Sequence, residues 1–303
     1  MGVMFIMMVG LPGSGKSTYA KELAREYNAI ICSSDSIREE LYGDENFQNQ
    51  NEKVFQILHK RIKQYLKDGV SVIYDATNIN SKRRRAFLNE IKKFHSTKMC
   101  VIMATRFDRC CDRNEHRLKR IVPYDVITRM YKNWNTPYWY EGWDIIKLKY
   151  EDDIPIYDNP HNLIFNYRNY NQDNPHHKET LGQHLKLVAN EFEEDTTLYY
   201  AGLLHDCGKI FTKSFINSKG EKTDIAHYYQ HHCVGAYNSL FYIFKGDVES
   251  LDVSILVNLH MMPYNWEKGF ENSEKIKRKY QKLWGDKLYN DVMLLHAADL
   301  KAH

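Results

Sequence analysis

The first half of the chain alternates short apolar runs with longer segments in which apolar residues recur every three or four positions. The apolar runs cover residues 3–9, 29–32, 70–74 and 99–104. The periodic segments between them cover residues 16–27, 52–67 and 81–94. Continuous apolar runs are typical of buried strands, and the longer period is typical of helices. This alternation predicts a parallel sheet covered by helices.

The pattern changes after residue 150. Residues 151–178 contain three of the seven prolines and few apolar runs, which indicates a connector. From residue 180 onward the periodic segments are helical, at 181–193, 196–204, 232–244, 251–260, 273–283 and 287–299. The pattern therefore predicts an α/β domain over residues 1–155, a connector over 156–174 and an all-α domain over 175–303.

Composition agrees with two folded domains. A chain of 303 residues exceeds one average domain, and 43% hydrophobic with 27% charged residues is typical of globular proteins. The net charge of +3 does not by itself indicate a nucleic-acid partner. Six cysteines without a CxxC pair favour free thiols in a reducing compartment. No apolar run reaches the roughly 20 residues that a membrane span needs, and the N-terminus lacks a basic leader, so we expect a cytoplasmic protein without a membrane partner.

A complete phosphate-binding loop follows the first predicted strand. Residues 10–18 read GLPGSGKST, which is the GxxxxGK[ST] pattern between a strand and a helix. In such loops, backbone N–H groups surround the phosphates of a nucleotide. We expect Lys16 to reach the β- and γ-phosphates of ATP and Ser17 to ligate Mg²⁺. The predicted nucleotide-binding residues are Gly10, Gly13, Ser14, Gly15, Lys16, Ser17 and Thr18.

Polar residues after the next two strands favour a kinase over other P-loop enzymes. Asp35 would point into the ligand crevice and accept the proton of an attacking hydroxyl, or it would only cap a helix. Arg38, one turn later, would hold a phosphate of the acceptor. Asp75 would support the Mg²⁺ site, and Thr77 and Asn78 would face the acceptor, although both also suit a turn.

Three arginines follow the fourth predicted strand. Arg113, Arg117 and Arg120 have the spacing of one helix face. A basic helical lid would stabilise the transferring phosphate and exclude water, whereas a solvated basic face is the alternative.

The segments GLPGSGKST, SSDSIRE, DATN and RNEHR resemble motifs of the polynucleotide 5′-kinase family, over about residues 3–150. The resemblance implies transfer of the γ-phosphate of ATP to the 5′-hydroxyl of RNA or DNA. It implies that Asp35 is the general base, that Arg38 binds the 3′-phosphate of the acceptor, and that Arg113 and Arg117 hold the donor.

In the second half, histidines and aspartates fall on several predicted helices. His205 and Asp206 are adjacent and can point at one metal ion, while His184 and Asp299 come from distant helices. Imidazole and carboxylate ligands suit Mn, Fe, Co, Ni or Zn, and such a metal would activate water. Any single histidine would equally suit a surface or core position.

The order of these residues resembles the HD superfamily of metal-dependent phosphohydrolases, over about residues 175–303. The segment HDCGK matches the HD-x-G-K motif, which implies that Lys209 contacts the scissile phosphate. The segment HHCVGA implies that His231 binds a second metal, and His232 stands where many members have an acid. The predicted metal ligands are His184, His205, Asp206, His231, His260 and Asp299.

Together the two resemblances imply an enzyme that heals nucleic-acid ends, with RNA favoured over DNA. It would phosphorylate 5′-hydroxyls with ATP and Mg²⁺. With one or two ions such as Mn²⁺, Co²⁺, Ni²⁺ or Zn²⁺, it would also remove a 2′,3′-cyclic or a 2′ or 3′ phosphate, so that a ligase can act downstream. The alternatives are a small-molecule or nucleoside kinase fused to an HD nucleotide phosphohydrolase, and a non-enzymatic module switched by ATP.

Overall fold

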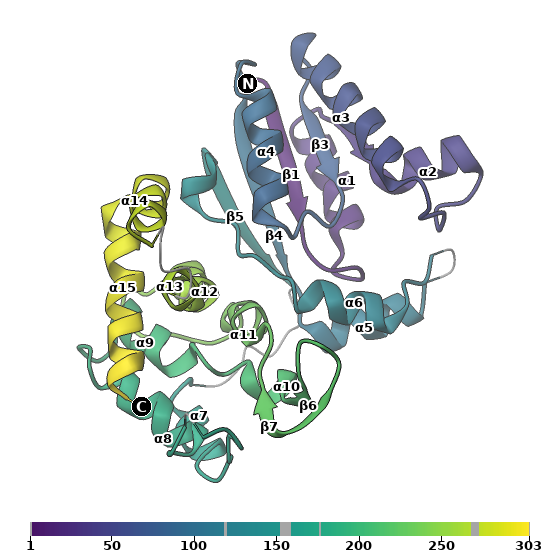
Figure 1. Ribbon diagram of the computed structural model, residues 1–303. Helices are drawn as coiled ribbons and strands as arrows, with labels where there is room; N and C mark the ends of the chain where they lie inside the picture. Colours follow the sequence, from purple (N-terminus) through teal and green to yellow (C-terminus); the bar gives the residue numbers. More distant parts are fainter. Residues whose placement is uncertain (1, 118–119, 152–158, 176, 268–272, 303) are drawn as a thin grey trace. The chain divides into compact units, whose positions relative to one another are not determined.

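The computed structural model divides the chain into two compact units (Figure 1). Residues 2–117, 120–151, 159–175, 177–267 and 273–302 are described. Unit 1 comprises Met1–Tyr131 and Pro137–Ile154, and unit 2 comprises Lys132–Thr136 and Pro155–His303. The domain boundaries predicted at residues 155 and 175 stay predictions, and the start of the predicted connector lies outside the described residues. In the described part of the chain, every helix is too short or too polar to cross a membrane.

The described part of unit 1 contains a five-stranded parallel sheet in the order β2-β3-β1-β4-β5, which confirms the predicted α/β architecture. The strands are β1 (Met4–Val9), β2 (Ile30–Ser33), β3 (Val72–Asp75), β4 (Thr97–Ala104) and β5 (Ile145–Tyr150). The helices are α1 (Lys16–Glu26), α2 (Ser34–Tyr42), α3 (Asn51–Lys67), α4 (Ser81–Ile91), α5 (Phe107–Glu115) and α6 (Tyr124–Tyr131), with a 3₁₀ turn, η1 (Trp139–Glu141).

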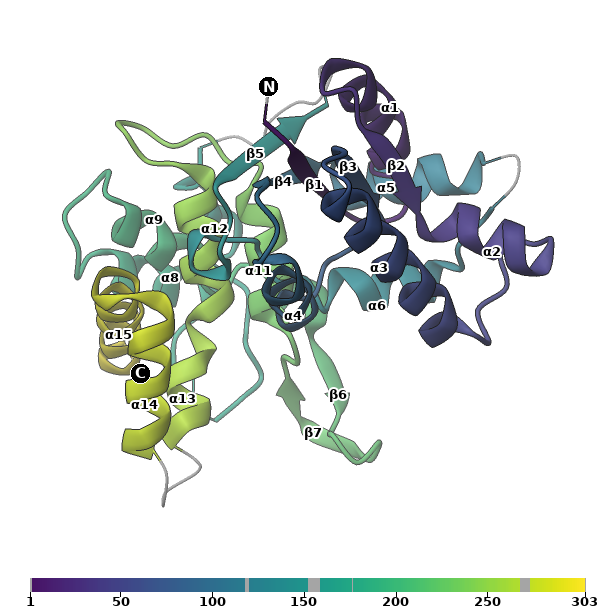
Figure 2. The ribbon, with the colours of Figure 1, turned by 90° about the horizontal axis from the view of Figure 1, so that it is seen from above.

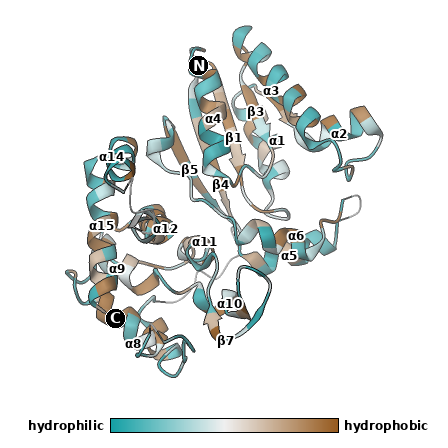
Figure 3. Cartoon of the chain, viewed as in Figure 1, coloured by the Kyte–Doolittle hydropathy of each residue, from teal (hydrophilic) through white to brown (hydrophobic). Residues whose placement is uncertain are grey.

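Strand β1 is apolar throughout because helices cover both faces of the sheet (Figures 1 and 3). Ile6 and Met8 belong to a buried cluster with Leu23 of α1. Phe5 meets Phe87 of α4 on the opposite face, with ring centroids 5.7 Å apart. Successive side chains of a strand point to opposite faces, so a strand buried on both sides gives a continuous apolar run.

A buried ion pair joins α4 to η1. Arg84 Nε and Nη2 donate to the Glu141 carboxylate at 2.8 and 2.6 Å, and the two side chains are 1% and 0% exposed. Ser81 and the Trp143 indole donate to the same carboxylate at 2.7 and 3.0 Å. Arg84 Nη1 also donates to the carbonyl oxygen of Asn78 at 2.8 Å, so the pair helps to fix the turn after β3.

We expect Glu141→Ala to lower the free energy of unfolding of unit 1 by about 3–5 kcal/mol, because it leaves the Arg84 cation buried without its carboxylate. Hydrogen exchange of the sheet amides measures this change. The double variant Arg84→Met, Glu141→Leu removes both charges and should cost less than the single variant. A Glu141→Ala protein with wild-type protection of β1 and β3 would show that the pair does not support the sheet.

Unit 2 is mainly helical. Its described helices are α7 (Asn162–Asn166), α8 (Leu181–Ala189), α9 (Thr197–Leu204), α10 (Lys209–Thr212), α11 (His231–Ser239), α12 (Ser250–Leu259), α13 (Met261–Glu267), α14 (Ser273–Trp284) and α15 (Asp286–Lys301).

The prediction of an all-α second domain was wrong for residues 214–227. They form an antiparallel hairpin of β6 (Ser214–Ile216) and β7 (Lys222–His227), seen in Figure 2. The turn is closed by the Asn217 N–H, which donates to the Glu221 carbonyl oxygen at 2.8 Å, and contains Gly220 at φ +84°. Strand β6 has only three residues, and the six residues of β7, KTDIAH, do not alternate apolar with polar positions, so neither strand gives a clear sequence signal.

A short segment between α6 and η1 belongs to the core of unit 2. Trp134 is fully buried, and its ring meets that of Tyr237 edge-on with centroids 4.9 Å apart. The Thr136 N–H donates to Asn258 Oδ1 at 3.3 Å, and Asn258 Nδ2 donates to the Trp134 carbonyl oxygen at 3.2 Å. Unit 2 is therefore not contiguous in sequence, and no local pattern predicts this.

Candidate active sites

The loop between β1 and α1 has the conformation that a phosphate site needs. Gly13 and Gly15 both have φ of +84°, and a Cβ on Gly13 would lie 2.1 Å from the Cys110 carbonyl oxygen. Only glycine fits these positions without strain. Thr105 Oγ1 donates to the Ser14 carbonyl oxygen at 3.1 Å, which ties the loop to the end of β4. The first N–H groups of α1 have no acceptor within the helix and can bind a phosphate. The loop that leads to them is held in one conformation.

Lys16 is buried at the start of α1. Its ammonium donates to the Leu11 carbonyl oxygen at 2.7 Å and to Ser14 Oγ at 3.3 Å. Burial lowers the pKa of Lys16 to about 8, although the Asp75 carboxylate opposes the shift. Burial also raises the pKa of Asp75, against the effects of Lys16 and of a hydrogen bond with Ser17. Lys16, Ser17 and Asp75 therefore lie together at the end of β3.

Asp35 lies in the first turn of α2, but it is not the N-cap. Ser33 caps the helix, because its side chain accepts from the Asp35 N–H at 3.2 Å. The Asp35 carboxylate instead accepts from Arg38 at 2.8 Å and also pairs with Arg120. Arg38 is 4% exposed, and its Nη2 donates to Asn51 Oδ1 at 2.7 Å. A buried guanidinium thus lies directly beside the predicted base.

The prediction that Arg113, Arg117 and Arg120 share one helix face was wrong. Helix α5 ends at Glu115, and Arg117 and Arg120 themselves are not helical. The Asn114 side chain ends the helix by donating to the Val122 carbonyl oxygen at 2.7 Å and accepting from the Val122 N–H at 3.0 Å. These two bonds tie Val122 to the end of α5, and helical spacing does not apply to Arg117 and Arg120.

A cavity of about 790 Å³ in unit 1 brings together most of the residues predicted for the kinase. Those that line it are Gly15, Lys16, Ser17, Thr18, Asp35, Arg38, Asp75, Thr77, Asn78, Arg117 and Arg120. Arg113 is not among the lining residues and pairs with Glu151. The Asn78 amide donates to the Met8 carbonyl oxygen at 2.9 Å, so it shapes the turn as well as the cavity wall.

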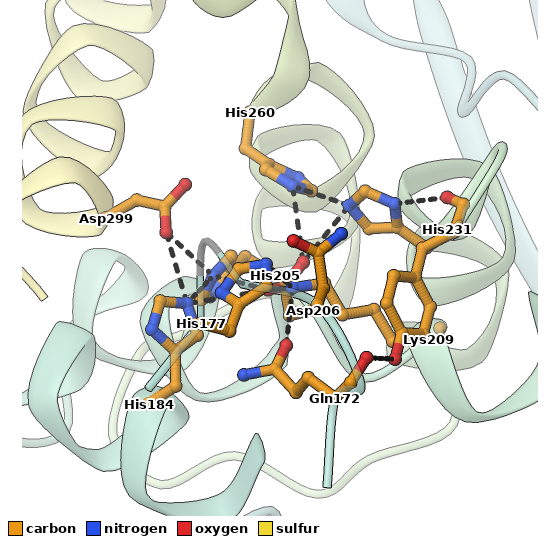
Figure 4. A network of polar contacts seen from close by, with 12 residues as sticks. Gln172, His177, His184, His205, Asp206, Lys209, His231, His260 and Asp299 are labelled. Atoms are coloured by element: carbon orange, nitrogen blue, oxygen red, sulfur yellow. Dashed lines mark hydrogen bonds and ion pairs between the residues drawn. The ribbon is translucent and has the colours of Figure 1, made fainter. Parts of the chain in front are cut away.

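Unit 2 gathers the six predicted metal ligands at one centre (Figure 4). They are His184 of α8, His205 and Asp206 after α9, His231 at the start of α11, His260 after α12 and Asp299 of α15. Among the described residues, two groups have ligand atoms that all lie within 4.8 Å of one another. They are His184 with His205 and Asp206, and Asp206 with His231 and His260.

Asp206 lies between two pairs of histidines. Its Oδ2 atom is 3.4 Å from Nε2 of both His184 and His205. Its Oδ1 atom is 3.1 Å from His231 Nε2 and 3.8 Å from His260 Nε2. The two Nε2 atoms are 3.1 Å apart in the first pair and 3.2 Å apart in the second. One carboxylate is therefore shared by both candidate metal positions.

Hydrogen bonds of Nδ1 with backbone carbonyl oxygens fix the tautomers of three of these histidines. In His205, His231 and His260, Nδ1 lies 2.8, 2.7 and 2.8 Å from the carbonyl oxygen of the residue three positions earlier. A carbonyl oxygen only accepts, so Nδ1 carries the hydrogen and a neutral ring presents its Nε2 lone pair to the centre. When these rings are neutral their Nε2 lone pairs face the same centre, and this nitrogen and oxygen donor set fits a transition metal.

Lys209 lies beside the same carboxylate. Its Nζ donates to Asp206 Oδ2 at 2.6 Å and to Gln172 Oε1 at 2.8 Å, and it lies 3.1 Å from His177 Nε2. Although burial opposes it, Lys209 and His205 hold the pKa of Asp206 well below its usual range. Asp206 is therefore a charged carboxylate at neutral pH.

Gly208 allows a close approach of two backbone segments beside this centre. A Cβ on Gly208 would lie 2.1 Å from the His231 carbonyl oxygen and 2.7 Å from the Gly235 backbone nitrogen. Position 208 must therefore be a glycine for α10 to pack closely against α11. This close packing holds Asp206 next to His231.

Three polar partners at the two sites were not predicted. Asn51 accepts from Arg38, Glu151 pairs with Arg113, and Gln172 accepts from Lys209. None of them belongs to a motif, and Gln172 lies in the predicted connector. Only Asn51 had a possible signal, because it lies directly before the periodic segment predicted at residues 52–67.

Comparisons with known proteins agree with the fold of unit 1. Residues 5–137 match the family described as an AAA domain. The L-seryl-tRNA(Sec) kinase of Methanococcus maripaludis is 30% identical over 148 residues, which are 47% of this chain and 56% of that protein. The chain thus spans about half the length of this curated relative. Unit 1 carries a P-loop kinase domain with homology to this tRNA kinase, and such domains use ATP with Mg²⁺.

Two solved structures are similar over part of the chain. The Pnkp1/Rnl/Hen1 RNA repair complex has a TM-score of 0.40 and 22% identity, covering 44% of this chain and 44% of that one. Kti12 of Chaetomium thermophilum in complex with ADP-AlF3 has a TM-score of 0.42 and 20% identity, covering 50% of this chain and 90% of that one.

Proposed function

We propose that unit 1 transfers the γ-phosphate of ATP to the 5′-hydroxyl of an RNA end. The observation that carries the proposal is the pair of Asp35 and Arg38 in the cavity that also contains Lys16 and Ser17. The Asp35 carboxylate does not cap its helix, and its contacts with Arg38 and Arg120 are made by Oδ1, so Oδ2 can accept from a hydroxyl. The Arg38 cation is suited to an anion next to that hydroxyl, such as the 3′-phosphate of the first nucleotide.

The residues of the cavity supply each part of the transfer. The loop N–H groups and Lys16 bind the ATP phosphates, and Ser17 with Asp75 behind it would hold Mg²⁺, which neutralises charge on the β- and γ-phosphates. The 5′-oxygen forms a bond to the γ-phosphorus while the bond to the β–γ bridging oxygen breaks, and ADP leaves. Asp35 takes the proton of the hydroxyl. Arg117 lines the cavity and would offset the charge of the transferring group, whereas Arg113 would have to exchange its Glu151 partner for the phosphate to do the same.

We further propose that unit 2 is a metal-dependent phosphohydrolase that removes a 2′,3′-cyclic phosphate or a 2′ or 3′ phosphate from the other RNA end. The shared Asp206 carboxylate and the converging Nε2 atoms support this proposal. His184, His205, Asp206 and Asp299 would hold one ion, and Asp206, His231 and His260 would hold another. Such ions activate water and polarise phosphate oxygens. Lys209 is placed to contact the scissile phosphate, and a ligase could then join the healed ends.

Two other acceptors compete with a 5′ end. The name of the relative points to serine attached to a tRNA, and the small-molecule alternative points to a free nucleoside. The buried Arg38 favours an acceptor that has a phosphate next to its hydroxyl, which free nucleosides lack. Labelling with γ-labelled ATP and each acceptor in turn tests the choice. Label on a 5′-hydroxyl oligonucleotide supports the proposal, and label only on seryl-tRNA or only on a nucleoside would contradict it.

ATP binding should weaken as the pH rises through the pKa of Lys16. Since that pKa is about 8, the free enzyme loses the ammonium charge above this pH. The protonated fraction falls about tenfold between pH 7 and pH 9 for such a group, so the Kd for ATP should rise by up to about tenfold. Calorimetric titration at both pH values measures the change. The Lys16→Met protein should bind weakly and show no such pH dependence, whereas an equal rise in Kd for both proteins would assign it to another group.

A further inference from the structure

The cavity of unit 1 extends beyond Asp35 and Arg38 to four aromatic side chains, which we call the aromatic wall. It consists of Phe55 and His59 of α3, Tyr74 of β3 and Phe87 of α4. Phe55 and His59 are half-buried, whereas Tyr74 and Phe87 are 4% and 2% exposed. The phosphate-transfer roles described above make no use of these rings.

The aromatic wall begins next to the residue that would hold the acceptor phosphate. Asn51, Phe55 and His59 are four residues apart along α3 and share one face of the helix. Asn51 accepts from Arg38 at 2.7 Å. With a helical rise of 1.5 Å per residue, Phe55 lies about 6 Å and His59 about 12 Å along the axis from Asn51. A planar group attached to an acceptor at Arg38 can therefore reach Phe55.

The rings of the aromatic wall support one another. The His59 ring lies 4.2 Å from that of Phe87 and 6.3 Å from that of Phe55, centroid to centroid. His59 Nε2 and the Tyr74 hydroxyl are 3.1 Å apart. Burial lowers the pKa of His59, so its ring is neutral at pH 7. The wall is thus a preformed, uncharged surface, which suits a flat ring better than a serine side chain or a sugar.

We propose that the aromatic wall binds the nucleobase of the first nucleotide of the acceptor. The inference rests on the proposed 5′-kinase function and deepens it, because it specifies that the accepted hydroxyl is on a nucleotide that carries a base. Every base has a π-face, so stacking here is tolerant of sequence. The wall would thus position the 5′-hydroxyl near Asp35 in RNA ends of any sequence.

The test compares two 5′-hydroxyl RNA oligonucleotides that differ only in their first residue, which is an ordinary nucleotide in one and abasic in the other. We expect wild-type kcat/KM to be lower for the abasic acceptor by between about 5- and 150-fold, mainly through KM, as stacking of one base on aromatic side chains implies. Phe55→Leu should lower kcat/KM for the intact acceptor and leave the abasic acceptor unchanged. Phe55→Tyr keeps an aromatic ring at this position and should keep the wild-type preference for the acceptor with a base.

Phe94→Leu is the matched control, because Phe94 is a half-buried phenylalanine of unit 1 that does not line the cavity. It should keep the wild-type preference for the intact acceptor. If wild type phosphorylates both oligonucleotides equally, or if Phe55→Leu lowers both rates by the same factor, the aromatic wall does not bind the base while the 5′-kinase function stands. If wild type phosphorylates neither oligonucleotide, the 5′-kinase function fails and the inference fails with it.

Discussion

Asp35→Ala should lower kcat for phosphoryl transfer by about 10²- to 10⁴-fold, which is the usual contribution of a positioned general base. The Kd for ATP should change little, because Asp35 makes no hydrogen bond with the phosphate loop and Ser33 caps its helix. The Asp35→Asn variant keeps the shape of the side chain and can still accept from Arg38, but it cannot take a proton. It should therefore be nearly as slow as Asp35→Ala.

Single-turnover transfer and calorimetric titration with ATP separate the two effects. Glu39→Ala is the matched control, since Glu39 is an exposed carboxylate on the same helix and does not line the cavity. That variant should transfer phosphate at the wild-type rate. Normal transfer by Asp35→Ala would exclude Asp35 as the base, and an equal loss of ATP binding would assign it to nucleotide binding instead.

Asp206→Ala should remove metal from both candidate positions of unit 2, because the two histidine pairs face different oxygens of this one carboxylate. We expect phosphohydrolase activity to fall by more than about 100-fold, since even outer partners of metal ligands contribute 10- to 100-fold. Metal content measured by mass spectrometry should fall for every ion that the wild-type protein retains. Kinase activity should stay at the wild-type level, because the ligand sets of the two sites do not overlap.

Two further variants separate the candidate positions. Asp299→Ala should weaken only the position of His184 and His205, and His260→Ala should weaken only the position of His231. Asp224→Ala, an exposed carboxylate of β7, is the control and should retain both metals and both activities. An Asp206→Ala protein with full metal content would contradict the shared-ligand arrangement. Loss of kinase activity in a folded Asp206→Ala protein would contradict the independence of the two activities.

The sequence predicted best those features that depend on residues close together in the chain. The phosphate loop is contiguous, and its glycines are required by local backbone geometry, as at Gly13. The six candidate metal ligands come from distant segments, but each lies in or next to a segment that the sequence predicts to be helical. The resemblance to the HD superfamily implied that they share one site. The tautomers of His205, His231 and His260 were visible only from the positions of the backbone carbonyl groups.

The features that the sequence did not predict depend on contacts between segments far apart in the chain. Arg117 and Arg120 have helical spacing, but the Asn114 side chain binds Val122 and ends α5 before them. The core of unit 2 takes Trp134 from a segment more than one hundred residues before Tyr237. Periodicity reports only which face of an element is buried, and not which distant segment covers it. The aromatic wall was missed for the same reason, since its four residues come from three elements and only the fold brings them together.

The most direct test of the central claim uses one RNA oligonucleotide with a 5′-hydroxyl and a 2′,3′-cyclic phosphate, incubated with the protein, ATP, Mg²⁺ and Mn²⁺. Mass spectrometry of the product reports both ends in one measurement. We predict a gained 5′-phosphate and a lost terminal phosphate, with Lys16→Ala removing only the first change and Asp206→Ala only the second. An oligonucleotide that is unchanged at both ends, while free nucleosides are phosphorylated or free nucleotides are hydrolysed, would contradict the account.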